Sequence, residues 1–286
     1  MKKILVPVDF SQNSISALHV AAEIAHKSGA VLEMLHVNQA AIYFGPFAEY
    51  SAVSAYAMED EEYDETATVE LEKLKMELMS DSKYSKLDVQ TRVEEGDLHT
   101  SVRNVSTEDD VDLIVMGTKG VSGIAEFLVG SNTEKVIRTA QCPVLAVPEG
   151  VKNFDPKIVL LPSTLKSDQN GVFRYLAQWE ESFDFIVKVL YLNNPSSLPT
   201  DGSAEAKKNR LAEAAGLKKP EVIITTKTLF EDSTILGTAD MCDADLIVMA
   251  THQRQGLSHF LFGSITEDTV NHSPIPVLAV PIGWRE

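Results

Sequence analysis

The chain has 286 residues, 44% of them hydrophobic, which is enough apolar material for one large domain or two ordinary ones. Its formal net charge of -17 argues against DNA, RNA or an anionic membrane as the main partner, because those ligands need clustered Lys and Arg. The two cysteines, Cys142 and Cys242, are far apart and fit a reducing compartment, and no segment approaches the roughly 20 apolar residues that span a bilayer, so we expect a folded cytoplasmic protein.

The first half predicts strands that alternate with helices. The apolar run at 3–8 is typical of a buried parallel strand, and 11–29 has apolar residues at helical spacing, with Ser11 as N-cap and Gly29 as the stop. The further elements expected are a strand at 31–37, a helix at 66–80, a strand at 87–93, a short helix after Gly96, a strand at 112–117, a helix from Ser131 and a strand at 143–148. Five strands with crossover helices predict a doubly wound parallel sheet.

An internal repeat sets the domain organisation. Residues 112–148 align without a gap with 245–281, and 19 of the 37 positions are identical when the two segments are compared letter by letter. Segments 156–165 and 186–193 are looser echoes of 2–11 and 31–38. We therefore expect two copies of one domain, residues 1–150 and 151–286, the first with an insertion at 39–65.

The last strand of each half, "PVLAVP", is unusually apolar for a strand at the edge of a sheet. An exposed apolar edge is a liability unless it is paired. We therefore expect 143–148 and 276–281 to pair antiparallel about a pseudo-two-fold axis, so that one chain forms an intrachain pseudo-dimer.

A cluster of glycines follows the strand at 112–117, in the segment "MGTKGVSGIAEFLVGS". It lacks the GK-Ser/Thr of a P-loop, and no glycine follows the first strand, where a dinucleotide fingerprint would lie. Gly117 and Gly120 would let backbone amides approach an anion, and the helix from Ser131 would add free N–H groups and the positive end of its dipole. This arrangement predicts a site for a diphosphate or triphosphate.

The spacing G-x2-G-x9-G-S, flanked by "DLIVM" and "CPVLAV", together with "KILVPVDFS" and "LHV", resembles the universal stress protein family in a tandem two-domain form. The resemblance implies two five-stranded domains of the adenine-nucleotide alpha-hydrolase-like fold. It also implies a stress-response protein that binds ATP (or ADP or AMP), with magnesium, between the ends of the first and fourth strands. Ligands of open α/β sheets generally bind where the winding reverses.

Carried over position by position, the resemblance assigns site residues in the first half. It implies adenine and ribose contacts for Pro7, Val8 and Asp9, an adenine slot at Val37, ribose contacts for Met116 and Gly117, and phosphate contacts for Gly120, Gly130, Ser131 and Asn132. Asp9 would lie near the sugar or a phosphate-bound magnesium. Lys119 is added for its charge alone.

The second half departs from this pattern. Ala250 replaces Gly117, Gln253 replaces Gly120, and either Ser163 or Thr164 replaces Asp9. We expect a degenerate site there and a domain that acts mainly as scaffold or partner surface. Without a recognisable catalytic constellation, at most slow ATP hydrolysis is expected. The alternatives are an interaction module without nucleotide and an ATP-using enzyme on a related fold.

Several residues also have purely structural interpretations. Asp9 could simply cap the following helix, and His36 is expected to be a satisfied, partly buried side chain. His252 and His259 are expected to be solvated, and the acidic run at 59–65 is expected to begin a helix. The insertion's aromatic residues could form a subunit contact, a satellite core or a lid; they are Tyr43, Phe44, Phe47, Tyr50 and Tyr56.

Overall fold

The structure is a computed structural model. It describes residues 1–38, 53–118, 131–163, 165, 169–191, 201–218, 220–224, 232–251 and 262–285. The predictions that concern Lys119, Gly120, Gly130, His252, His259 and most of the insertion therefore lie outside the described residues. None of the described helices is long and apolar enough to cross a membrane.

A single ten-stranded sheet runs through the whole molecule, in the order β3-β2-β1-β4-β5-β10-β9-β6-β7-β8. Its strands are β1 (Lys3–Pro7), β2 (Val31–Asn38), β3 (Val89–Glu95), β4 (Leu113–Thr118), β5 (Val144–Pro148), β6 (Ile158–Ser163), β7 (Ile186–Tyr191), β8 (Glu221–Ile224), β9 (Leu246–Thr251) and β10 (Val277–Pro281). Each half contributes five parallel strands with the same winding. The predicted pair of doubly wound domains is therefore confirmed.

The two halves meet where β5 pairs antiparallel with β10. Leu145 lies directly opposite Leu278, and both side chains are fully buried. Every residue of the two strands is buried, which explains why the last strand of each domain has such an apolar sequence. The predicted antiparallel pairing about a pseudo-two-fold axis is confirmed.

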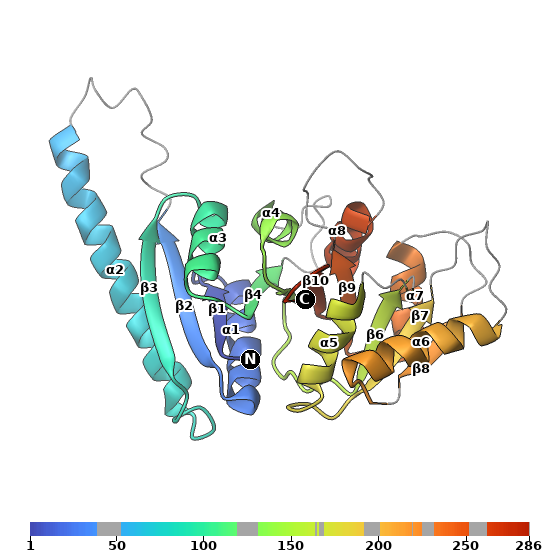
Figure 1. The fold of residues 1–286 in the computed structure, drawn as a ribbon. Helices are drawn as coiled ribbons and strands as arrows, with labels where there is room; N and C mark the ends of the chain where they lie inside the picture. The colour runs from blue at the N-terminus through green and yellow to red at the C-terminus, as the bar shows by residue number, and fades with distance from the viewer. Residues whose placement is uncertain are drawn as a thin grey trace.

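Helices cover both faces of the sheet and make three layers (Figure 1). The helices are α1 (Gln12–Ser28), α2 (Val53–Ser80), α3 (Leu98–Glu108), α4 (Ser131–Thr139), α5 (Asn170–Trp179), α6 (Asp201–Ala215), α7 (Asp232–Met241) and α8 (Phe262–His272). The core on one face includes α1, α2, α5 and α6, and the core on the other includes α3, α4, α7 and α8. Both cores draw residues from the two halves, so the domains share one interior.

The ends of α1 follow the local signals in the sequence. The Ser11 hydroxyl caps the helix by accepting a hydrogen bond from the Ser14 amide, at 3.3 Å between N and Oγ. Gly29 ends it in the left-handed conformation, with φ of 71°, and donates its amide to the Ala25 carbonyl. Both predicted boundaries are confirmed.

The second helix begins much earlier than expected. The helix predicted at 66–80 is instead α2, which starts at Val53 inside the predicted insertion. The acidic run at 59–65 therefore lies within the helix, and the expectation that it begins the helix is wrong. Leu71 and Leu78, two turns apart, are buried in the core on one face of the sheet, so packing holds the part of the helix that the sequence predicts.

Polar contacts fasten the two domains together on both sides of the β5–β10 junction. Lys27, at the end of α1, forms an ion pair with Asp155 and lies 4.6 Å from the ring centroid of Phe183. Near the C-terminus, the Arg285 guanidinium donates to the carboxylates of Asp110 and Asp112. The relative position of the domains is therefore set by more than the strand pair.

The continuous sheet predicts a pattern of amide exchange. The amides of Leu145 and Leu278 should exchange at the slowest rates in the protein, because both lie in fully buried central strands. The amides of β8, an outermost strand of the sheet, should exchange faster. Hydrogen exchange followed by mass spectrometry or NMR tests this, and fast exchange at Leu278 would contradict the junction.

Candidate functional site

The winding of the first domain reverses between β1 and β4. Strand β1 continues through α1 to β2 on one side, whereas the chain reaches β4 on the other side only after β3. The β1–β4 pairing covers Ile4 and Leu5 alone, while β1 stays paired with β2 as far as Pro7 and β4 with β5 as far as Thr118. The carboxyl ends of β1 and β4 therefore diverge, which is where open α/β sheets bind ligands.

Most of the predicted site residues that the structure describes lie at this edge of the sheet. Pro7, Val8 and Asp9 end β1, Val37 lies near the end of β2, and Met116 and Gly117 lie near the end of β4. Val8, Val37 and Met116 are buried, and Asp9 is exposed. Asn132 is an exposed residue in the first turn of α4, and Ser131 begins that helix.

Thr133 fixes the first turn of α4 to the end of β4. Its hydroxyl donates to the Gly117 carbonyl at 3.1 Å, and its side chain is buried. Ser131 and Asn132 are thereby held beside Gly117. The sequence reasoning missed Thr133, although the repeat held a signal: its equivalent, Thr266, is the same residue and is also buried.

Gly117 allows α1 to approach β4 closely. A Cβ at this position would lie 2.3 Å from the backbone carbonyl oxygen of Asn13, in the first turn of α1. The absence of a side chain at Gly117 therefore makes room for the start of α1, beside the place where β1 and β4 diverge. This is a packing reason for the glycine, in addition to the ligand contact that the sequence predicts.

Asp9 organises the corner between β1 and α1. Its Oδ1 accepts hydrogen bonds from the Ser11 amide at 3.0 Å and the Ser11 hydroxyl at 2.6 Å. Phe10, between them, has a φ of 62°, a conformation that a bulky residue rarely adopts. The suggestion that Asp9 itself caps the helix is wrong, because Ser11 is the cap and Asp9 holds Ser11 in place.

The surroundings of Asp9 favour the charged form of its side chain over the protonated form. Partial burial opposes its charge, but the hydrogen bonds from Ser11 and Ser14 outweigh that effect and lower the pKa of Asp9 below its usual value. Asp9 is therefore ionised at neutral pH, at the place where the diverging strands end.

His36 supports the same corner from β2. Its Nδ1 lies 2.8 Å from the Val8 carbonyl oxygen, and since a carbonyl only accepts, Nδ1 carries the proton. Its ring lies 4.9 Å from that of Phe10, centroid to centroid. The expectation of a satisfied, partly buried histidine is confirmed.

The corresponding corner of the second domain is built differently. Asp112 accepts hydrogen bonds from the backbone amides of Lys2 and Lys3, and its equivalent Asp245 accepts them from the amides of Lys157 and Ile158. Each residue of β1 therefore corresponds to the residue 155 positions later in β6. This register makes Ser163 the equivalent of Val8. Thr164, rather than Ser163, is therefore the equivalent of Asp9.

Ser163 and Gln169 satisfy each other inside that corner. Ser163 Oγ donates to Gln169 Oε1 at 2.5 Å and accepts from the Leu165 amide at 3.0 Å. Both side chains are buried. The polar groups at this end of β6 are thus hydrogen-bonded within the protein.

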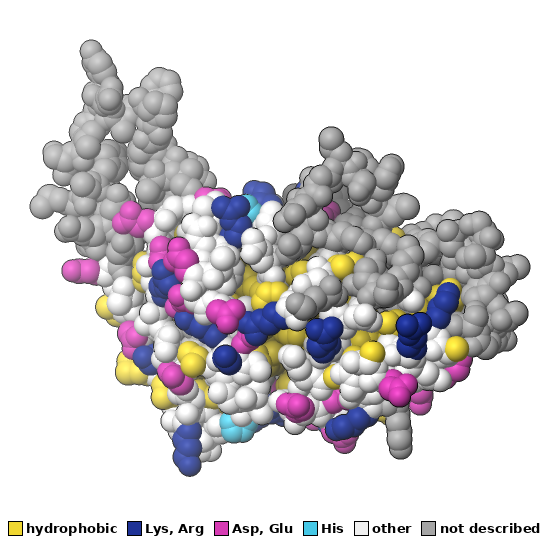
Figure 2. Space-filling model, viewed as in Figure 1, with side chains coloured by type: hydrophobic (Ala, Val, Ile, Leu, Met, Phe, Trp, Pro, Cys, Tyr) yellow, Lys and Arg dark blue, Asp and Glu magenta, His cyan; other side chains and the backbone are white. Residues whose placement is uncertain are grey.

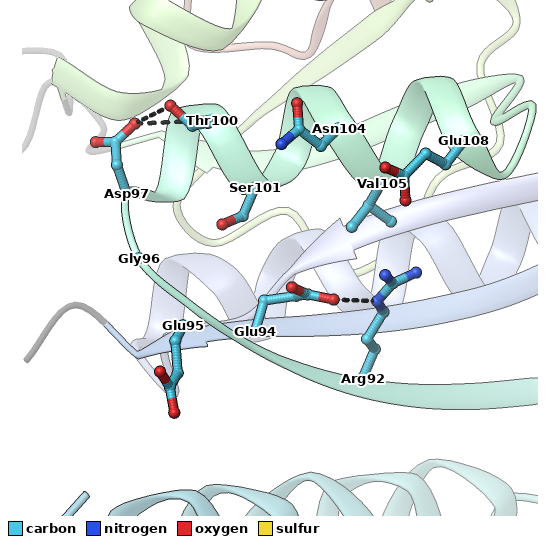
Figure 3. A pocket seen from close by; sticks show the side chains of 10 residues that line it. All are labelled: Arg92, Glu94, Glu95, Gly96, Asp97, Thr100, Ser101, Asn104, Val105 and Glu108. Carbon is cyan, nitrogen blue, oxygen red and sulfur yellow. Dashed lines mark hydrogen bonds and ion pairs between the residues drawn. The ribbon is translucent and has the colours of Figure 1, made fainter. Parts of the chain in front are cut away.

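A separate hollow of about 290 Å³ lies between the end of β3 and α3 (Figure 3). Its lining includes Glu94, Glu95, Asp97 and Glu108, and the guanidinium of Arg92 is bonded to Glu94. None of the predicted site residues lines it. A wall with this excess of carboxylates repels a polyphosphate, so the hollow does not replace the predicted site.

The chain matches the model of the universal stress protein family over residues 1–148 and 165–281. It belongs to the universal stress protein family. Universal stress protein YxiE of Bacillus subtilis is 29% identical over 149 residues, which cover 51% of this chain and 97% of that protein. Universal stress protein MJ0531 of Methanocaldococcus jannaschii is 32% identical over 151 residues, which cover 53% of this chain and 84% of that protein.

A solved universal stress protein from Archaeoglobus fulgidus shares the fold along almost the whole chain. The structures superpose with a TM-score of 0.68 and 19% identity, covering 98% of each chain. YxiE and MJ0531 each match about half of this chain, whereas the fold of the archaeal protein extends over both halves. The two-domain arrangement therefore also occurs in that protein.

The close approach of α1 to β4 predicts that Gly117→Ala destabilises the protein by about 1–3 kcal/mol, since the new methyl group collides with backbone. The matched control is Gly237→Ala within α7, where a Cβ meets nothing within 4 Å and should stabilise by about 0.5–1 kcal/mol. Urea unfolding of both variants measures the difference. Equal effects would contradict the packing role.

The lowered pKa of Asp9 predicts a pH effect. A carboxyl with a lowered folded-state pKa stabilises the fold above its unfolded-state pKa, and this contribution is lost as pH falls through the folded value. Asp9→Asn should therefore lose less stability than the unmodified protein between about pH 5 and pH 2. Denaturant midpoints at both ends of this range test it; parallel losses would contradict it.

Proposed function

We propose that the first domain binds one adenine nucleotide, ATP, ADP or AMP, at the diverging carboxyl ends of β1 and β4. The observation that carries the proposal is the end of β1–β4 pairing at Leu5, with the first turn of α4 held beside Gly117 by Thr133. The base would contact Val8 and Val37, and the ribose would contact Met116; all three side chains are buried and apolar. The free amides of the first turn of α4 would face the phosphates.

Magnesium fits this site as an ion carried by the nucleotide. The described residues contain no group of three His, Cys, Asp or Glu side chains that could hold a metal ion. Magnesium commonly binds one or two carboxylates together with substrate phosphates. The exposed carboxylate of Asp9 would supply the protein's oxygen.

We propose that nucleotide occupancy is a signal in a cytoplasmic stress response and that hydrolysis is at most slow. The Asp9 carboxylate accepts hydrogen bonds from Ser11 and has a lowered pKa. Both features make it a weak general base for activating water. No catalytic role is therefore assigned to it.

The second domain, in this proposal, is mainly scaffold or partner surface. The buried Ser163–Gln169 pair occupies the corner that corresponds to Val8, and Thr164 stands in place of the Asp9 carboxylate. Opening this corner to a ligand would leave buried polar groups without partners, which costs about 1–3 kcal/mol each. Most of its packing is retained, because β9 repeats the sequence and burial of β4 except where the buried Ala250 replaces the partly buried Gly117.

Titration calorimetry with ATP and magnesium tests the proposal. We expect one nucleotide per chain, and Gly120→Gln, which copies Gln253 of the second half, should abolish binding by adding a side chain to the phosphate loop. The matched control is the reverse change, Gln253→Gly, which should leave the stoichiometry at one. Two equivalent nucleotides would overturn the division between domains, and none would favour the interaction module.

A further inference from the structure

One bidentate ion pair joins α4 of the first domain to α8 of the second. Arg138 donates from Nε to Glu267 Oε1 at 2.8 Å and from Nη2 to Glu267 Oε2 at 2.7 Å. Nη2 also bonds Glu134, one turn earlier in α4, at 2.6 Å. The Glu267 side chain is 18% exposed and the Arg138 side chain 37%, so this is a partly buried contact with the bidentate geometry of a charge-assisted pair.

This ion pair holds the opposite end of the helix that begins the candidate phosphate site. Helix α4 has nine residues, and Arg138 lies seven residues, or about 10 Å along the axis, from Ser131. Thr133 holds the first turn against Gly117, and Arg138 holds the last turn against Glu267. A short helix fixed at both ends cannot tilt freely, so the direction of its first amides depends on both contacts.

The contact is one-sided with respect to the repeat. Residues of the first domain from 112 to 148 correspond to residues 133 positions later, so Glu267 is the equivalent of Glu134, and Asn271 is the equivalent of Arg138. A symmetric pair of domains would have two such arginine–glutamate contacts. Asn271 cannot make the second, and its buried Oδ1 has no hydrogen-bond partner among the described residues.

The one-sided ion pair and the nucleotide motif both distinguish the first domain from the second. The second domain supplies a carboxylate to the helix of the domain that keeps the motif, while α8, in the domain with the degenerate motif, has no arginine at the corresponding position. We propose that Glu267 is a positioning residue for the nucleotide site of the first domain, acting through Arg138 on α4. The inference rests on the proposed nucleotide binding and gives the second domain a defined role in it.

The test is ATP titration of the full chain with Glu267→Gln, which keeps the size of the side chain and removes its charge. We expect affinity to fall about fivefold or more, the lower end of typical couplings between sites. The matched control is Asp155→Asn, which removes another interdomain ion pair, that with Lys27, on the opposite face of the sheet. This control should bind ATP as the unmodified protein does.

A double variant identifies the route. If Glu267 acts through Arg138, then Arg138→Gln with Glu267→Gln should bind ATP no more weakly than Arg138→Gln alone. In the absence of nucleotide, Glu267→Gln should also speed amide exchange in α4, which Asp155→Asn should not. Unchanged ATP affinity in Glu267→Gln, with only a lower melting temperature, would show a merely structural contact and overturn the proposal.

Titration of the unmodified protein separates the two levels of inference. If it binds ATP and the Glu267 variant binds equally well, the positioning role fails and the proposed function stands. If the unmodified protein binds no adenine nucleotide, the proposed function fails and the role of Glu267 fails with it.

Discussion

The antiparallel pairing of β5 with β10 is the contact on which the rest of the molecule depends. Each five-stranded sheet ends in a strand whose residues are all buried, and alone each strand would expose apolar side chains and a row of unpaired backbone groups. Pairing removes both edges at once and makes one sheet with two continuous cores. It also brings α4 beside α8 and the end of α1 beside Asp155, which precedes β6, and the interdomain ion pairs form at these two places.

Outside this junction, the two domains keep the same structural contacts, some with the same residues and some with different ones. Asp112 and Asp245 each clasp the start of the first strand of their domain. The contact between the last two helices of each half is kept even where the chemistry changes: His99 bonds Thr139 in the first half, and at the equivalent positions Asp232 bonds His272. Packing geometry has therefore been preserved through substitution. The differences gather at the corner that follows the first strand, where Asp9 accepts hydrogen bonds from Ser11 in the first domain and Ser163 bonds Gln169 in the second.

The described surface carries charges of both signs, with acidic residues in excess over the whole sequence. Acidic and basic side chains both occur across the described part of the face in Figure 2, and the chain carries 42 acidic residues against 25 basic ones. A phosphate would therefore be held by local geometry at the end of the sheet rather than by a broad positive field. This makes the position of α4 important, and α4 is held by contacts from both domains.

The sequence by itself determined the features that depend on residues close together in the chain or on the repeat. Ser11 and Gly29 mark the ends of α1 because capping involves only a few neighbouring residues, and the repeated "PVLAVP" predicts the junction because an apolar edge needs a partner. Only the tertiary structure decided the start of α2, the match of Thr164 with Asp9, the packing role of Gly117 and the link from Glu267 to Arg138. Arg138 and Glu267 are 129 residues apart, and Gly117 is explained by the backbone of Asn13, more than 100 residues earlier. Such contacts depend on how the folded sheet brings distant segments together, which no local pattern records.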